Sequence, residues 1–215
     1  MQAVVYSEPY EVERRLKQLD IPVEALVRAA QAGHTALVTR SPNDPPSLPG
    51  TNAWGHTVRA VRDELLAIGG WRKDDPGNFS LTINDELGIN IYVSSGDMYT
   101  GREPPYRQPK TKSPKGLYAE AAIKINTAQG DLFGNFQSDL VRKAITLGHP
   151  TWFYLVYITD DEIRAELSFP DDFMDNEVSS WKERIIIRYI GTDPGVINTT
   201  KDFGPDFDVP VLRKK

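Results

Sequence analysis

The stretch WFYLVYI, residues 152–158, decides the fold that this sequence predicts. All seven residues are apolar or aromatic, and they do not alternate with charged residues. This pattern is typical of a central β-strand that is covered on both faces. After a turn signal at 159–161, Ile163, Ala165, Leu167 and Phe169 alternate with polar residues, which predicts a partner strand with one polar face.

Other segments show the same two-residue period. Residues 79–84 and 87–93 alternate on either side of Asp85 and Glu86, which predicts a β-hairpin with one buried face. Apolar residues also alternate in 118–126, and residues 184–190 read RIIIRYI, so each segment predicts a further strand. We interpret residues 171–180 as an acidic connection between strands.

A period of three to four residues marks the helices. The first is expected to begin at Ser7 and Pro9, and the second to begin at Asp20 and end at Gly33. Residues 54–68 form the clearest helical stripe, and 136–147 predict a helix that covers the sheet. The predicted fold is α+β, with N-terminal helices followed by a mostly antiparallel sheet of five to six strands covered chiefly on one side.

The same pattern predicts the organisation of the chain. Residues 1–40 are expected to form a helical subdomain, and the proline-dense segment 41–53 a connector. Residues 54–191 are expected to form the α+β core domain, and 192–215 an extended C-terminal tail.

Composition limits the classes of function. The 215 residues carry a net charge of −5, so a protein that coats nucleic acid over its whole surface is excluded. The chain has no cysteine, which removes disulfides, thiolate zinc sites and cysteine nucleophiles. No apolar run approaches the length of a membrane helix and no signal-peptide pattern begins the chain, so we expect a cytoplasmic protein without a membrane partner.

The segment SSGDMYTGREPPYRQPKTKSPKG, residues 94–116, fits neither helix nor strand periodicity. Five basic residues and one acid lie between Arg102 and Lys115, so this loop is cationic in an acidic protein. We expect it to lie between two strands of the sheet. Long loops in compact domains are usually either functional or disordered.

Our first hypothesis is a binding protein whose 94–116 loop contacts nucleic acid or a nucleotide, without a metal or other cofactor. Glycines in the loop permit close backbone approach, and its hydroxyls and cations are donors for phosphate or carboxylate oxygens. The candidate ligand-binding residues are Ser95, Thr100, Arg102, Arg107, Lys110, Lys112 and Lys115. The alternative interpretation is a solvated loop whose charges keep a proline-rich segment soluble.

A second hypothesis is a Mg²⁺-dependent nuclease. Asp97 at the end of one strand, with Glu120 and Lys124 on the next, loosely resembles the arrangement in nucleases of the restriction-enzyme type. In that family carboxylates hold Mg²⁺ and the lysine supports the attacking water. The chain departs from the family pattern at Ala122, where an acid is expected two residues before the lysine.

A third hypothesis is a non-catalytic subunit that docks on a protein partner through exposed aromatic residues and the tail.

The glycines of 96–101 have P-loop spacing, but Arg102 and Glu103 stand where Lys and Ser or Thr are required, which excludes a P-loop. The three histidines lie far apart in the sequence, so no histidine-rich metal site is expected.

Overall fold

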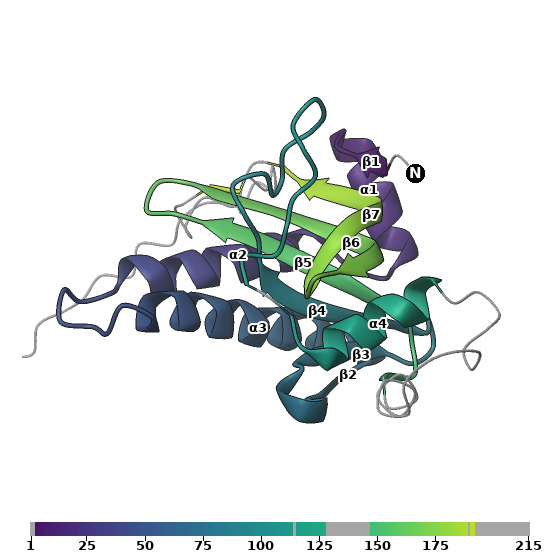
Figure 1. Ribbon diagram of the computed structural model, residues 1–215, viewed down its shortest axis with the longest axis horizontal. Coiled ribbons are helices and arrows are strands. Elements are labelled where there is room, and N and C mark those ends of the chain that lie inside the picture. The colour runs from purple at the N-terminus through teal and green to yellow at the C-terminus, as the bar shows by residue number, and fades with distance from the viewer. Residues whose placement is uncertain (1–2, 114, 128–146, 189, 192–215) are drawn as a thin grey trace, which may run out of the picture.

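The computed structural model describes residues 3–113, 115–127, 147–188 and 190–191. In this part of the chain, seven strands form one mixed sheet in the order β1-β7-β6-β5-β4-β3-β2 (Figure 1). The strands are β1 Val4–Tyr6, β2 Trp71–Asp74, β3 Leu81–Asn84, β4 Ile89–Ser95, β5 Thr151–Ile158, β6 Ile163–Met174 and β7 Glu177–Ile187. The helices are α1 Pro9–Gln18, α2 Val23–Val38, α3 Leu48–Ile68, the short 3₁₀ helix η1 Pro76–Asn78, and α4 Leu117–Thr127.

Strand β5 lies at the centre of the sheet, as predicted. It pairs in parallel with β4 and antiparallel with β6. Phe153, Tyr154 and Leu155 are all completely buried, because successive side chains enter the cores on opposite faces. The predicted hairpin is also confirmed, since β3 and β4 pair antiparallel across the turn.

The α+β class is confirmed, but the prediction of a mostly antiparallel sheet with five to six strands was wrong. The sheet has seven strands and is mixed, because β1 pairs in parallel with β7 and β4 in parallel with β5. The sequence did not reveal β1 and β2, which have three and four residues. Such short segments contain too few alternations for a period of two to be detected.

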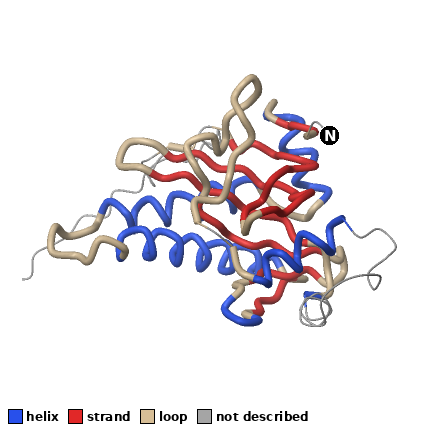
Figure 2. The backbone as a smooth tube through the Cα atoms, viewed as in Figure 1, coloured by secondary structure: helices blue, strands red, loops and turns tan. Residues whose placement is uncertain are grey.

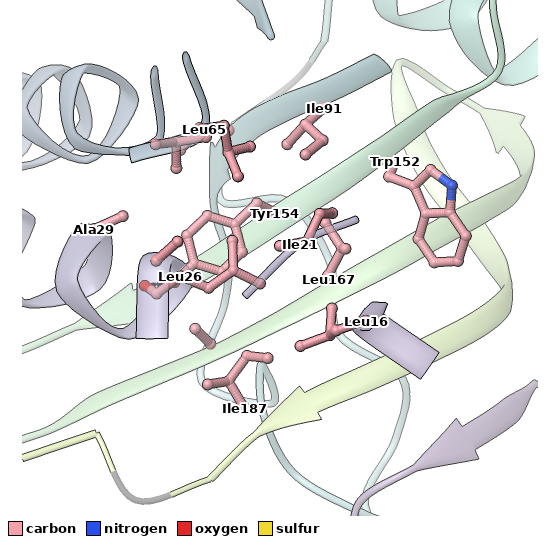
Figure 3. Close-up of a cluster of buried hydrophobic side chains, with 14 of the residues drawn as sticks. Leu16, Ile21, Leu26, Ala29, Leu65, Ile91, Trp152, Tyr154, Leu167 and Ile187 are labelled. Atoms are coloured by element: carbon pink, nitrogen blue, oxygen red, sulfur yellow. Dashed lines mark hydrogen bonds between the residues drawn. The ribbon is translucent and has the colours of Figure 1, made fainter. Parts of the chain in front are cut away.

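Helices α1, α2 and α3 cover one face of the sheet (Figures 1 and 2). Figure 3 shows Leu16 and Leu26 of these helices beside Tyr154 and Leu167 of the central strands. The phenolic oxygen of Tyr154 is completely buried and donates a hydrogen bond of 2.6 Å to the carbonyl oxygen of Leu26. The N-terminal helices and the sheet thus share one hydrophobic core.

Four helix boundaries differ from the prediction, and one of them is the start of α2, which begins at Val23 and not at Asp20. Ser7 does not cap α1, because its hydroxyl donates instead to Glu103. Helix α2 continues past Gly33 to Val38. Gly33 does not end the helix; its lack of a side chain lets α2 lie close against α3. Helix α3 begins at Leu48, inside the predicted connector. The division into a subdomain, connector, core domain and tail stays a prediction.

The predicted strand at 118–126 was wrong, because this segment forms α4. Ala119, Ala121, Ala122 and Ile123 are buried together, and three alanines in five residues favour a helix. Ala121, Ile123 and Ile125 occupy every second position by chance, and this spacing does not reflect a strand. Helix α4 packs on the face of the sheet opposite α1–α3, against Phe153 and Leu155.

The predicted acidic connection at 171–180 was also wrong, because β6 and β7 form one long hairpin through it. Asp175 and Asn176 make the turn, both with positive φ, a conformation that these two residue types tolerate better than most. The predicted helix at 136–147 lies outside the described residues except for Leu147, and so does the tail 192–215. No helix in the described ranges has the length and apolar character needed to cross a bilayer.

Candidate ligand-binding cleft

The first two residues of the 94–116 loop belong to the end of β4, and the rest of the loop connects β4 to α4. The expectation that the loop joins two strands was therefore wrong. Its two ends pair with each other. Gly96 forms an antiparallel bridge with Thr111, and the backbone N–H of Lys112 donates to the carbonyl of Ser95 at 2.9 Å. The N–H of Asp97 donates to the carbonyl of Lys110 at 2.9 Å. These bonds extend β4 and hold the loop in one conformation at its base.

The loop crosses the sheet on the face opposite α1–α3 and covers a buried ion pair (Figure 1). Glu166 and Arg184 are 0% and 1% exposed, and Arg184 Nη2 lies 2.5 Å from Glu166 Oε2. Arg184 Nε and the hydroxyl of Ser168 donate to Glu166 Oε1. Glu166 lies on the strand face that the sequence predicts to be polar, and its partner is Arg184 on β7.

This ion pair also anchors the loop. The N–H of Gly101 donates to Glu166 Oε2 at 2.8 Å, and Arg184 Nη2 donates to the carbonyl of Arg102 at 3.0 Å. A Cβ at Gly101 would lie 3.3 Å from the backbone nitrogen of Ala165, and φ at this glycine is +69°. Glycine at 101 therefore lets the loop backbone rest directly on β6.

Further hydrogen bonds fix both halves of the loop. Arg164 Nη1 donates to the carbonyls of Met98 and Thr100. On the other half, the indole N–H of Trp181 donates to the carbonyl of Pro109 at 2.8 Å. A loop held by hydrogen bonds in this way presents its remaining side chains in defined positions.

A cleft of about 390 Å³ opens where the loop meets the carboxyl ends of β4 and β5. The loop and α3 contribute Met98 and Trp54 to its apolar walls, and the indole N–H of Trp54 donates to the carbonyl of Val93 at 3.1 Å. The other apolar residues that line it include Leu37, Ala53, Tyr157 and Ile158. In sheets with parallel strands, the carboxyl ends of those strands are a common ligand site.

The charged side chains of the cleft come from the predicted residues, whereas its polar residues Thr57 and Ser94 were not predicted. Ser95, Asp97, Arg107 and Lys112 all line it. Arg107 Nη2 lies 3.7 Å from Asp97 Oδ2, and its guanidinium lies over the ring of Tyr99 at 4.0 Å. Lys112 is exposed and forms no ion pair within the described part of the chain. The cleft thus has a cationic rim and an apolar wall.

The remaining candidate ligand-binding residues lie elsewhere. Thr100 is completely buried inside the loop, so its hydroxyl is inaccessible to a ligand. Lys110 Nζ forms an ion pair of 2.6 Å with Glu177. The guanidinium of Arg102 lies 5.1 Å from the centre of the Tyr106 ring. Lys115 is partly buried near the β6–β7 turn, where its N–H donates to the carbonyl of Asn176.

The three residues of the nuclease hypothesis are not arranged as that hypothesis requires. Glu120 and Lys124 form an i,i+4 ion pair of 2.7 Å on α4, whereas Asp97 lies at the cleft. The strand that was to align them with Asp97 is a helix. Within the residues described, no three His, Cys, Asp or Glu side chains are grouped closely enough to hold a metal ion.

We compared the chain with known proteins by family models, by curated sequences and by solved structures. None of them matches. Function must therefore be inferred from the cleft and from the residues that surround it. Sequence reasoning missed Trp54 and Tyr157 as cleft residues, because a tryptophan in a helical stripe and a tyrosine in a buried strand are both typical of a core.

Lys115 gives a test of how the loop packs. Burial lowers its pKa from 10.5 to about 8. Below pH 8 the lysine is charged in both the folded and the unfolded protein, so the folded state carries the whole desolvation cost. As pH rises from 8 to 10.5 the folded state loses its proton first, and stability rises with pH.

Lys115→Met should therefore stabilise the protein at pH 7 by about 1 kcal/mol, allowing for partial solvent access to the amine. This gain should shrink above pH 8 and vanish near pH 10.5, the ordinary pKa of lysine. Urea unfolding of both proteins across this range measures the difference. The exposed Lys112→Met is the control, and an equal response from it would contradict the burial of Lys115.

Proposed function

We propose that this protein is a binding protein whose cleft beside the 94–116 loop takes an anionic ligand, a nucleotide or a nucleotide unit of a nucleic acid. The observation that carries the proposal is the position of Arg107 and Lys112 on the rim of a cleft whose wall is Trp54. An indole face suits a planar base, and the two cations suit phosphate oxygens. A cleft of about 390 Å³ is within the range of small-molecule sites.

Hydrogen bonds already made within the protein support this assignment. Trp54 is fixed by its bond to Val93, and Arg107 is held over Tyr99, so little side-chain freedom is lost when a ligand binds. Asp97 Oδ1 accepts from the N–H of Tyr99, and its other oxygen faces Arg107. Asp97 therefore partly offsets the rim charge and also offers an acceptor for a ribose hydroxyl or an exocyclic amine.

The test is a titration of the purified protein with AMP and ATP at about 50 and 200 mM salt, with adenosine and inorganic phosphate as the half-ligands. We expect both nucleotides to bind more tightly than either half-ligand, and ATP to be the more sensitive to salt. Arg107→Gln with Lys112→Gln should weaken ATP binding by about tenfold or more, because two charge-assisted contacts are lost.

The matched control removes two cations that lie away from the cleft, Lys110→Gln with Lys73→Gln. Lys110 is paired with Glu177, and Lys73 is exposed on the edge strand β2. This variant has the same net charge as the rim variant, but neither lysine lines the cleft, so it should bind ATP like the wild type. Equal weakening in the two variants would show that overall charge, and not the cleft, attracts the ligand. Absence of nucleotide binding to any form would refute the proposal.

A further inference from the structure

We infer that the ligand is a single-stranded nucleic acid, with one nucleotide in the cleft and the neighbouring base stacked on Tyr106. This inference rests on the proposed function and specifies the class of ligand. Its basis is a second surface on the loop, made by Arg102 and Tyr106, that lies next to the cleft and that a mononucleotide would not use.

The loop carries two arginine–tyrosine pairs. Arg107 lies over Tyr99 at the rim of the cleft, and Arg102 lies over Tyr106 beyond it, with 5.1 Å between the Arg102 guanidinium carbon and the ring centre. Tyr106 is 53% exposed although it is a large aromatic residue. The exposed ring and its guanidinium neighbour form a platform on which a base can stack.

The platform is continuous with the cleft. Met98 lines the cleft, and its carbonyl oxygen accepts from Arg102 Nε at 3.3 Å. Tyr106 precedes Arg107, which also lines the cleft. Met98 is 57% exposed, so apolar surface extends from the wall of the cleft toward the platform.

The acids nearest the platform already have partners. The carboxylate of Glu103 accepts from Ser7 and from Arg188, and that of Asp97 is held by Tyr99 and Arg107. Arg102, Arg107 and Lys112 are the cations that face a ligand spanning the cleft and the platform, because Arg107 is still largely exposed beside Asp97. A ligand that extends from one to the other would place its phosphates between these three side chains.

The size of the cleft favours a single strand over a duplex. A volume of about 390 Å³ suits one nucleotide, and a base can enter only when it is neither paired nor stacked within a duplex. Stacking on an exposed tyrosine likewise needs a free base face, and it tolerates any base because each has a π-face. Three phosphate contacts on a single strand predict a slope of about −2 for log affinity against log salt concentration.

The experiment is fluorescence anisotropy with a labelled 12-nucleotide single strand, as DNA and as RNA, and with the corresponding duplexes, from about 50 to 200 mM salt. AMP binding is measured in parallel by calorimetry. We expect at least one of the single strands to bind about tenfold or more tightly than its duplex and than AMP. The slope should be close to −2, because only three cations are involved.

Two variants isolate the platform. Tyr106→Ala should weaken single-strand binding by about tenfold and leave AMP binding unchanged, because AMP does not reach the platform. Tyr106→Phe keeps the ring and should bind like the wild type. The side chain is more than half exposed, so neither variant should alter thermal stability.

The outcomes separate the two proposals. If AMP binds at the cleft but the single strand binds no more tightly, or Tyr106→Ala has no effect, the inference fails and the proposed function stands. If the duplex binds as tightly as the strand, the inference also fails. If AMP does not bind, the proposed function fails, and the inference that rests on it fails as well.

Discussion

Arg184→Met should destabilise the protein by about 3–5 kcal/mol, because it breaks a buried ion pair by removing only one partner. Arg184 and Glu166 are 1% and 0% exposed, so the variant leaves a carboxylate buried without its cation. The bonds from Ser168 and Gly101 remain but cannot replace a charge. Urea unfolding at neutral pH measures the loss.

The double variant Arg184→Met with Glu166→Leu distinguishes an unpaired charge from lost packing. It removes both charges and keeps much of the buried volume, so it should regain part of the stability, although the Gly101 N–H and the Ser168 hydroxyl lose their acceptor. Thermodynamic coupling between the two positions should therefore be strong. If the loss of stability in the double variant equals the sum of the losses in Arg184→Met and Glu166→Leu, the two residues act independently and the pair does not explain the effect.

The same substitution should release the loop. Arg184 donates to the carbonyl of Arg102, and Glu166 accepts from the N–H of Gly101, so the pair anchors the middle of the loop. Under native conditions, trypsin should cleave after Arg102 and Arg107 faster in Arg184→Met than in the wild type. Unchanged cleavage at these two sites would show that the other loop contacts suffice.

Gly33→Ala should destabilise the protein by about 2 kcal/mol, although alanine favours helices. A Cβ at Gly33 would lie 2.2 Å from Thr57 Oγ1 and 2.9 Å from the carbonyl oxygen of Ala53. Thr57 Oγ1 donates to that carbonyl at 2.8 Å, so rotating it away breaks a buried hydrogen bond. Helices α2 and α3 would have to separate.

Gly55→Ala is the matched control on α3. A Cβ there meets no atom within 4 Å, so only helix propensity changes, and a gain of up to about 1 kcal/mol is expected. Thermal or urea unfolding of the two variants should therefore shift in opposite directions. Ala53 and Thr57 also line the cleft, so Gly33→Ala should weaken nucleotide binding as well. If the unfolding transitions of Gly33→Ala and Gly55→Ala shifted in the same direction, the close contact between α2 and α3 at Gly33 would be contradicted.

The sequence predicted those elements whose pattern depends on burial along a single strand or helix. The continuous run at 152–158 indicated the central strand because both its faces are covered, and the stripe at 54–68 indicated α3. The pattern at 118–126 misled because alanine and isoleucine are compatible with both periods. The helix propensity of the alanines and the packing of α4 against β5 and β6 together select the helix.

The candidate site was predicted in part. The charge of the 94–116 loop correctly drew attention to Arg107 and Lys112, which line the cleft. The sequence did not show that Glu166 pairs with Arg184, since these residues are 18 positions apart and meet only through β6–β7 pairing. Polar residues that alternate with apolar ones normally face solvent, and here a loop covers them instead.

Because β1 pairs with β7, the first strand of the sheet cannot reach its partner until β7 has been synthesised. Val4 lies opposite Glu183, and Arg15 of α1 also binds Glu183, 168 positions later in the chain. At about 5–20 residues per second, a ribosome needs roughly 10–30 s to pass from one to the other. During that interval α2 and α3 can pack against each other, while β1 still lacks its partner strand.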